Sequence, residues 1–263
     1  MHTEMTDLLE KRYSAYAAGF RTGDIGFDKN IDLKISHTMR VCDLITEIAD
    51  RLHLDDKACF TARICALFHD IGRYEQFSRW GTFADSESEN HGILGAKVIK
   101  ENDLLEPLRE RMRSIVLAVV ENHNKLYIDE DLDEDQNFFT RMVRDADKLD
   151  IWKVVLEYYT SPPEKRLESI GLGLADTPEV SEEVCRQLLS DTMVKSTRLK
   201  TLNDLKLLQM GWIYDLNFIP SFEIAAERDY IGRIFETLPE NPVIDEIYRK
   251  ITSFIQLKLA EAV

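Results

Sequence analysis

Apolar residues recur along this chain with the 3.6-residue period of amphipathic helices, and no series of alternating strands is visible. The seven prolines and eleven glycines fall mostly between the periodic segments, where helices are expected to end. The spacing predicts helices over residues 4–20, 36–53, 56–72, 91–102, 105–123, 136–160, 179–195, 201–216, 222–237 and 243–261. We therefore expect an all-α fold.

The helical pattern is interrupted over residues 161–178, where the stretches SPPEK and GLGLADTP occur. We place a domain boundary there, with a first helical domain over residues 1–175 and a C-terminal helical extension over residues 176–263. The extension is expected to pack on the first domain as a cap, and a separate second domain is the alternative. Because no histidine follows residue 178, we expect the extension to supply no metal ligand.

Composition narrows the range of partners. Hydrophobic residues make up 44% of the 263 residues, enough for a real core, and the formal net charge is −15. Such an acidic chain repels nucleic-acid polymers and anionic membranes, although a local basic pocket can still bind a phosphate.

No apolar run approaches the ~20 residues that span a bilayer. The four cysteines lack CxxC spacing and suit a reducing compartment, so we predict a cytoplasmic protein.

Four polar residues interrupt apolar stripes on four different predicted helices. His37 begins a stripe whose apolar members follow at helical spacing, and His69, His123 and Asp147 also lie on core-facing positions. A lone inward histidine is usually a core residue with a hydrogen-bond partner. A buried carboxylate such as Asp147 needs a cation or several donors, and Arg144 is the nearest candidate partner in the sequence. A metal ion would satisfy all four groups together, because imidazole nitrogen and carboxylate oxygen are common ligands of transition metals.

Two further features extend this set. His69 is followed directly by Asp70 at the end of a predicted helix, and Gly72 follows closely enough for both side chains to converge on one ion beyond the helix end. His91 lies near a predicted helix start, and the segment GTFADSESENH before it is either a lid or an ordinary connecting loop.

With these residues, the chain resembles the HD-domain superfamily of metal-dependent phosphohydrolases. The matching stretches are ISHTMRV around His37, ALFHDIGR around His69 and Asp70, and RDADKLDIW, in which Asp147 rather than Asp145 matches the family's last ligand. The resemblance covers about residues 30–160 and implies a helical bundle with the metal at its centre. His91 and His123 match extra histidines of branches that bind two metals, including certain cyclic-dinucleotide phosphodiesterases. The GYP signature of one such branch is absent.

By resemblance, the expected activity is hydrolysis of a phosphomonoester or phosphodiester by metal-activated water. The substrate is a small-molecule phosphate ester, with nucleotides among the candidates. The cofactor is one or two divalent transition metal ions, drawn from Fe, Mn, Zn, Ni or Co. In the two-ion interpretation Asp70 bridges the ions; the first also uses His37, His69 and Asp147, and the second His91 and His123.

Phosphoryl oxygens gain charge in the transition state and need fixed cations. Arg73 is the first candidate, Lys125 the second and Lys148 the third, and a solvated surface charge is the alternative for each.

Two other classes of function remain open. The first is a dinuclear iron oxygenase, because some HD-fold proteins, such as myo-inositol oxygenase, use a similar ligand set for oxygen chemistry. A non-catalytic signalling module that binds nucleotide without turnover is the other alternative, although an intact ligand set argues against it.

Overall fold

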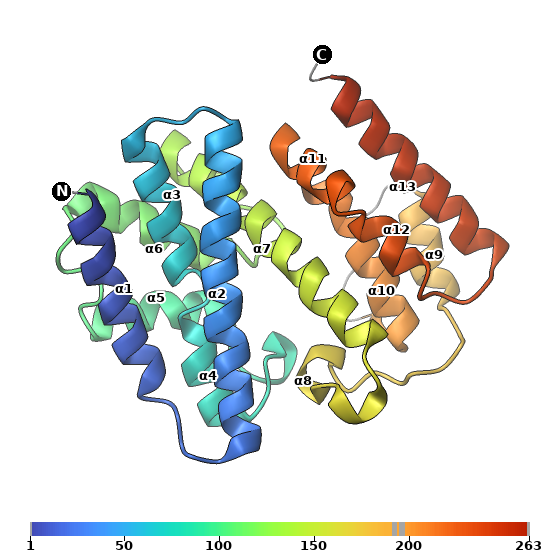
Figure 1. The fold of residues 1–263 in the computed structure, drawn as a ribbon, viewed down its shortest axis with the longest axis horizontal. Helices are drawn as coiled ribbons and strands as arrows, with labels where there is room; N and C mark the ends of the chain where they lie inside the picture. Colours follow the sequence, from blue (N-terminus) through green and yellow to red (C-terminus); the bar gives the residue numbers. More distant parts are fainter. Residues whose placement is uncertain (1, 191–193, 195–197, 262–263) are drawn as a thin grey trace. The chain divides into compact units, whose positions relative to one another are not determined.

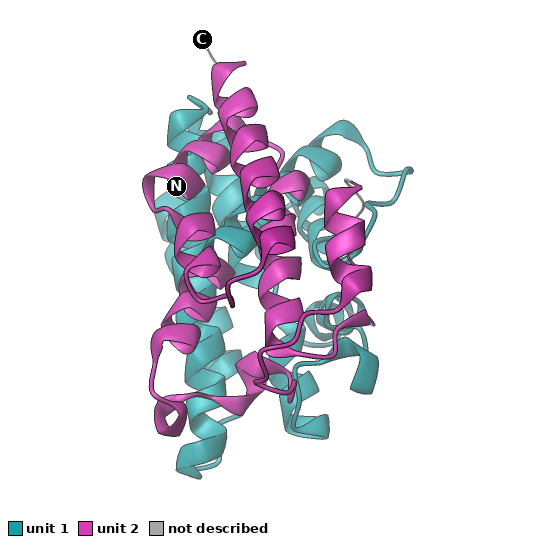
Figure 2. Ribbon diagram, turned by 90° about the vertical axis from the view of Figure 1, so that its right-hand side faces the viewer, with its two compact units in different colours: residues 1–150 teal, residues 151–263 magenta. Residues whose placement is uncertain are grey.

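A computed structural model describes residues 2–190, 194 and 198–261. It confirms the all-α fold, because the described residues form helices and a single β-bridge between Ala175 and Thr201. The chain divides into two compact units, Met1–Asp150 and Ile151–Val263, which Figure 2 colours separately. The division falls inside one long helix, α7 (Glu134–Thr160).

The first unit contains the predicted metal ligands and is built mainly from α2, α3, α5 and α6 (Figure 1). Within this unit α2 packs on α3, α3 packs on α6, and α5 packs on both α4 and α6. Its helices are α1 (His2–Ala18), α2 (Ile25–Arg51), α3 (Asp56–Phe68), α4 (Gly72–Trp80), η1 (Asp85–Glu87), α5 (His91–Glu101), α6 (Glu110–Asn122) and the first part of α7.

The second unit consists of the end of α7 and shorter helices, among which α13 packs on α9 and α11. These helices are η2 (Pro163–Lys165), α8 (Glu168–Gly171), α9 (Glu182–Leu189), α10 (Leu202–Gly211), η4 (Trp212–Asp215), α11 (Ile219–Glu227), α12 (Tyr230–Phe235) and α13 (Pro242–Ala260). The boundary between residues 175 and 176 and the packing of a C-terminal cap stay predictions, since compactness alone does not delimit a folding domain.

Several helix boundaries differ from the sequence-based expectation, and local chemistry explains the differences. α2 begins at Ile25 rather than at residue 36, because the Asp24 side chain accepts a hydrogen bond from the Phe27 backbone N–H and caps the helix. α6 begins at Glu110 rather than at residue 105, and turns occupy the residues around Pro107, whose ring disfavours helix in the preceding residue.

Two other differences concern whole helices. Residues 72–80, which the hydrophobic pattern did not single out, form α4. The single helix expected over residues 222–237 is divided into α11 and α12 at Asp229, whose φ of 47° is left-handed. The helix expected over residues 179–195 ends at Leu189 as α9, and residues 191–193 and 195 lie outside the described part of the chain.

One glycine sets the approach of α4 to α5. A Cβ atom at Gly72 would lie 2.3 Å from the His91 carbonyl oxygen and 2.6 Å from the Gly95 backbone nitrogen. Only a residue without a side chain allows these two backbones to come so close. The turn at His69 and Asp70 is thereby brought next to the first residue of α5.

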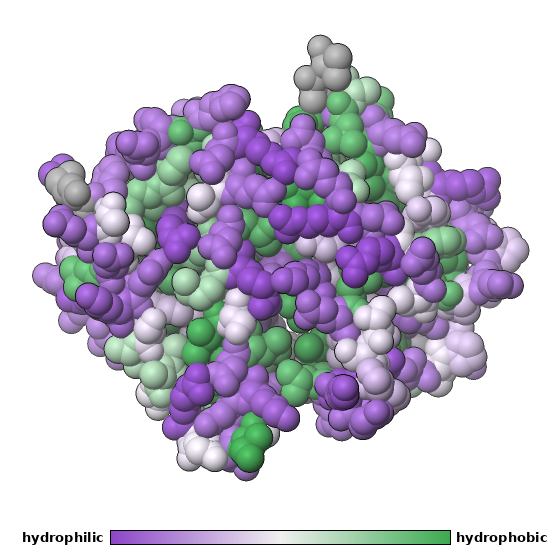
Figure 3. Space-filling model, viewed as in Figure 1, coloured by the Kyte–Doolittle hydropathy of each residue, from purple (hydrophilic) through white to green (hydrophobic). Residues whose placement is uncertain are grey.

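Hydrophilic side chains cover most of the face drawn in Figure 3, with smaller apolar patches between them. This surface agrees with the 31% of charged residues in the chain. Among the described residues, no helix combines the length and the apolar character that a membrane span requires.

Candidate metal centre

Four helices and one turn of the first unit bring four histidines and two aspartates together. α2 supplies His37, the turn between α3 and α4 supplies His69 and Asp70, and the start of α5 supplies His91. The C-terminal end of α6 supplies His123, and α7 supplies Asp147. All except Asp147 are buried, and the Asp147 side chain is 20% exposed. The six side chains predicted from the sequence therefore converge within one unit.

One half of the cluster is formed by His37 and His69, whose Nε2 atoms lie 3.3 Å apart. Asp147 Oδ1 lies 3.1 Å from the Nε2 atom of His37 and 3.7 Å from that of His69. Asp70 Oδ2 completes this half, at 3.5 Å from His37 Nε2 and 3.8 Å from His69 Nε2. We call these four residues the first half of the centre.

The other half is formed by His91 and His123, whose Nε2 atoms lie 3.0 Å apart. Here the second oxygen of the same carboxylate takes part: Asp70 Oδ1 lies 3.3 Å from His91 Nε2 and 3.7 Å from His123 Nε2. Asp70 thus stands between two histidine pairs and presents a different oxygen to each. We call His91, His123 and Asp70 the second half of the centre.

The other ring nitrogen of each histidine is held from outside the cluster. His69 Nδ1 donates to the Ala66 carbonyl oxygen at 2.7 Å, and His123 Nδ1 donates to the Val120 carbonyl oxygen at 2.9 Å. A carbonyl oxygen can only accept, so it assigns the proton to Nδ1. In the neutral ring, Nε2 is then a bare lone pair that points into the cluster.

Carboxylates perform the same task for the other two rings. His37 Nδ1 donates to Asp150 Oδ2 at 2.7 Å, and Arg40 binds both oxygens of Asp150 at 2.6 and 2.9 Å. His91 Nδ1 donates to both oxygens of Asp85, each at 2.8 Å. Carboxylate–histidine pairs of this kind orient metal-bound imidazoles in proteins.

These contacts give a direct test of whether the residues fit a metal ion. Two lone pairs that face each other at 3.0 to 3.3 Å repel unless a proton or a cation lies between them. Ligands at about 2.0–2.1 Å from one ion are separated from each other by roughly 3–3.5 Å, which matches the spacing of the closest pairs here. The donor set, with its oriented nitrogens and shared carboxylate, fits a divalent transition metal.

Burial and charge pull the acidities in the cluster in opposite directions. Burial favours the protonated form of Asp70, but Lys34, His69 and Arg73 together hold the pKa of this carboxyl well below its usual range. For Asp147, burial is likewise outweighed by the neighbouring imidazoles of His37 and His69, and its pKa is also well below the ordinary value. Both carboxylates are therefore ionised and available to a cation.

The pKa values of His91 and His123 are shifted in the opposite direction from that of His37. Burial lowers the pKa of His91 to about 3, with Arg73 acting in the same direction, and burial also lowers the pKa of His123. Burial opposes charge on His37 as well, but its hydrogen bonds to Asp147 and Asp150 raise the pKa of that imidazole. The His91–His123 pair is thus neutral, the form that binds a metal.

Three residues at the centre were not singled out by the sequence. Asp150 orients His37, Asp85 orients His91, and Lys34 places its ammonium 2.7 Å from Asp70 Oδ2. Two of them had a usable signal, since Lys34 precedes His37 by three residues and Asp150 follows Asp147 by three, which puts each pair on one helix face. Asp85 lies in the loop that leads to His91, where no period exists to identify it.

The cations predicted from the sequence lie at different places. Arg73 donates from Nε to Asp70 at 3.3 Å and from Nη1 to Asp85 at 3.1 Å, so it lies within the centre. The Lys125 ammonium pairs with Asp129, and among the described residues no contact joins it to the six side chains of the cluster. Lys148 is buried in α7 and donates to the Arg144 carbonyl oxygen. The catalytic roles predicted for Arg73 and Lys125 stay predictions.

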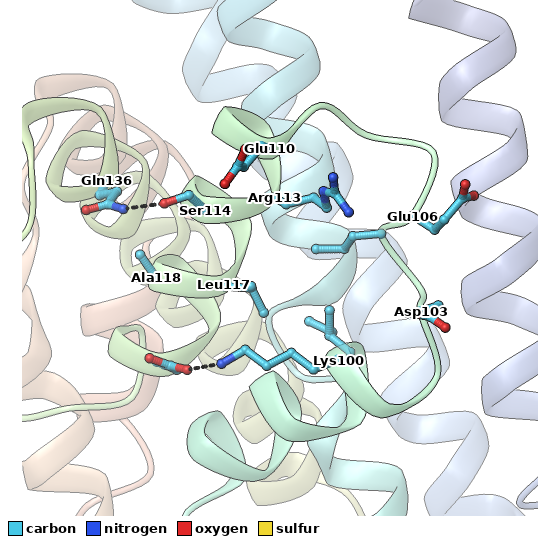
Figure 4. Close-up of a pocket in the computed structure, with 12 residues that line it drawn as sticks. Lys100, Asp103, Glu106, Glu110, Arg113, Ser114, Leu117, Ala118 and Gln136 are labelled. Carbon is cyan, nitrogen blue, oxygen red and sulfur yellow. Dashed lines mark hydrogen bonds and ion pairs between the residues drawn. The ribbon is translucent and has the colours of Figure 1, made fainter.

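A hollow of about 670 Å³ lies elsewhere in the first unit, along α5 and α6 (Figure 4). Both charged and apolar side chains line it, and they include the ion pair between Lys100 and Glu121. None of the six clustered side chains lines this hollow. The cluster and this hollow are therefore separate features of the first unit.

Comparison with protein families identifies the region that contains the cluster. Residues 35–152 match the family model of the HD domain. This region is an HD domain. The matched residues include all six side chains of the cluster, together with Asp85 and Asp150. Comparisons with curated proteins and with solved structures gave no match.

The HD domain belongs to a superfamily that consists mostly of metal-dependent phosphohydrolases and binds divalent metals. In this HD domain, two buried groups could hold such an ion, namely His37, His69 and Asp70, and Asp70, His91 and His123. Both groups contain Asp70, as the two-ion interpretation of the sequence requires.

Proposed function

We propose that the protein is a metal-dependent phosphohydrolase that acts on a small-molecule phosphate ester. The observation that carries this proposal is the position of Asp70, whose two oxygens face two separate histidine pairs. Phosphomonoesters and phosphodiesters, including nucleotides, are the proposed substrate class. The cytoplasm stays the predicted location.

We further propose two metal ions. His37, His69, Asp70 and Asp147 would hold the first, and Asp70, His91 and His123 the second. When bound, such ions acidify a coordinated water, whose pKa falls from about 16 towards 7, and so supply a nucleophile at neutral pH. Iron, manganese, zinc, nickel and cobalt all accept this mixture of imidazole and carboxylate.

The chain's own residues then have distinct tasks. Asp70 joins the two halves and fixes their separation. Arg73 holds Asp70 and Asp85 in place through its Nε and Nη1 groups. The partly exposed carboxylate of Asp147 marks the side of the cluster that solvent reaches, and we propose that the phosphate ester enters there. Lys125 is kept as a proposed contact for a substrate at the surface.

The positive charge beside the cluster supports an anionic substrate. Lys34 and Arg73 both lie within hydrogen-bond distance of Asp70, and their side chains are only 15% and 16% exposed. Fixed cations stabilise the oxygens of a phosphoryl group as charge develops on them. A dinuclear iron oxygenase would use the same ligands, so the reaction itself must separate the two activities.

The test is a substrate panel under anaerobic conditions. Protein reconstituted separately with each metal is incubated with aryl phosphomonoesters, aryl phosphodiesters and nucleotides, and product release is measured without oxygen. Hydrolysis that stops on chelation and returns with the metal is the expected result. Oxygen consumption by the ferrous protein without anaerobic hydrolysis would favour the oxygenase, and metal-loaded protein that binds a nucleotide unchanged would favour a signalling module.

A further inference from the structure

Lys34 was not singled out from the sequence, and its surroundings differ from those of the other cations at the centre. It lies in α2, one turn before His37, and its Nζ atom is 2.7 Å from Asp70 Oδ2. Its side chain is 15% exposed, so the ammonium is largely removed from water but not sealed off. The same Asp70 oxygen lies 3.5 Å from His37 Nε2, so only one carboxylate oxygen separates the ammonium from that imidazole nitrogen.

The two arginines nearest to the centre hold carboxylates in place through directed hydrogen bonds. Arg40 gives Nε and Nη2 to the two oxygens of Asp150. Arg73 gives Nε to Asp70, and its Nη1 group donates to Gln76, to Asp85 and to the Phe83 carbonyl oxygen. Both guanidinium groups are therefore bracing elements whose release would disturb the carboxylates that they hold.

Lys34 has donors to spare. An ammonium carries three N–H donors, and among the described residues that of Lys34 meets one acceptor, Asp70 Oδ2. Its other neighbour is the Phe83 ring, whose centroid lies 5.2 Å from Nζ. An aromatic face attracts the cation without taking up a directed hydrogen bond and restricts where the ammonium can move.

We propose that Lys34 binds the phosphoryl group of the substrate, and that Arg73 is a positioning residue. This inference rests on the proposed phosphohydrolase function and assigns to Lys34 the contact that the sequence pattern assigned first to Arg73. Lysine is a common phosphate ligand because it offers a compact positive charge with several donors. A group bound at the first half of the centre lies beside the same Asp70 oxygen that fixes this ammonium.

The experiment measures the binding of inorganic phosphate to the metal-loaded full chain by calorimetry, together with metal content by elemental analysis. Lys34→Gln keeps a donor for Asp70 but removes the charge. Loss of one charged hydrogen bond to phosphate should weaken its binding about 10- to 100-fold while the metal-to-protein ratio stays unchanged. Lys34→Arg should recover most of the affinity. Lys29→Met, at an exposed position of the same helix, should match the wild type.

The outcomes distinguish this inference from its alternatives. Equal phosphate affinity in Lys34→Gln and wild type overturns it, and so does a loss of phosphate binding that only follows a loss of metal. If Lys34→Gln does not fold, the test uses folded, metal-loaded Lys34→Arg. A phosphate affinity of Lys34→Arg that is at least about 100-fold below that of the wild type then overturns the inference as well. Wild-type protein that binds phosphate through Lys34 but hydrolyses no ester contradicts the proposed function and leaves the Lys34 contact intact.

Discussion

The two halves of the centre share Asp70 but differ in how the rest of the chain supports them. The first half adds a second carboxylate, Asp147, and its His37 is oriented by Asp150, whose side chain is 1% exposed. The second half has no carboxylate besides Asp70 among the described residues, and its His91 is oriented by Asp85, whose side chain is 31% exposed.

The two halves also differ in the secondary-structure elements that carry their carboxylates. Asp147 and Asp150 both belong to the long helix α7, three residues apart, so one rigid segment supplies a predicted ligand and an orienting group. Asp85 belongs to the short η1 turn between α4 and α5, where fewer backbone hydrogen bonds restrain it. We infer that the first half binds its ion more tightly and that the second half exchanges its ion more readily.

The largest expected effect comes from the residue that both halves share. Asp70→Asn keeps the shape of the side chain but removes the charge that faces both histidine pairs, and it leaves Lys34 and Arg73 beside a neutral amide. We expect hydrolysis to fall by at least about 100- to 1,000-fold and metal content to fall in both halves. Asp43→Asn, at a side chain that is 77% exposed on α2, is the control for elemental analysis and rates. Full metal content in Asp70→Asn would refute the shared carboxylate.

The next comparison removes one ligand from each half. Under the two-ion proposal, His91→Ala should lower the metal-to-protein ratio from near two to near one while the fold survives. Asp147→Ala should remove the ion of the first half. Elemental analysis of protein purified without chelator, before and after reconstitution, measures both.

Two results of the metal analysis would contradict the two-ion proposal. An unchanged ratio in His91→Ala with activity lost would show that His91 contacts the substrate or transfers a proton at a one-metal centre. No metal in wild-type protein after reconstitution would remove the basis of both predictions.

The two halves were not equally open to prediction from the sequence. His37, His123 and Asp147 each interrupt an apolar helical stripe, so the 3.6-residue period alone places them inward. His91 begins α5 and has no stripe of its own, and its place in the set came from family resemblance. That each Asp70 oxygen faces a different pair depends on the turn between α3 and α4, and no sequence period describes a turn.

The residues that orient the histidines were harder to predict from the sequence than the histidines themselves. A hydrogen bond from Nδ1 to a carboxylate depends on where two side chains meet in space, and sequence spacing restricts this only within one helix. Asp150 could have been found as the residue one turn after Asp147, whereas Asp85 belongs to a loop. Helix α4 was missed for a related reason, since its sequence GRYEQFSRW carries only a short apolar pattern.

A third prediction compares the two orienting carboxylates. Asp150→Asn and Asp85→Asn each remove the charge that fixes one histidine, and losing a group that orients a metal-bound imidazole typically costs about 10- to 100-fold in metal affinity. Asp150→Asn should weaken the ion of the first half and also destabilise the fold, because Arg40 loses a bidentate partner, at about 1–3 kcal/mol. Asp85→Asn should weaken the second half with a smaller loss of stability. Metal titration and thermal melting measure the two effects, and equal loss of both ions in Asp85→Asn would contradict the division into halves.

The smallest effect concerns the glycine that lets α4 approach α5. In Gly72→Ala the new Cβ would meet the His91 carbonyl oxygen and the Gly95 backbone nitrogen, which are backbone atoms that cannot rotate away. The two helices must separate slightly, at about 1–3 kcal/mol, and this displaces His91 more than His37. We expect a lower melting temperature and weaker binding of the second ion, with the first ion retained.

Gly81→Ala is the matched control at the other end of α4, where a Cβ meets nothing within 4 Å but φ is +67°. It should cost about 1–2 kcal/mol through backbone strain and leave both ions in place. If Gly72→Ala retained the second ion as fully as Gly81→Ala, the close approach of α4 and α5 would have no part in building the second half.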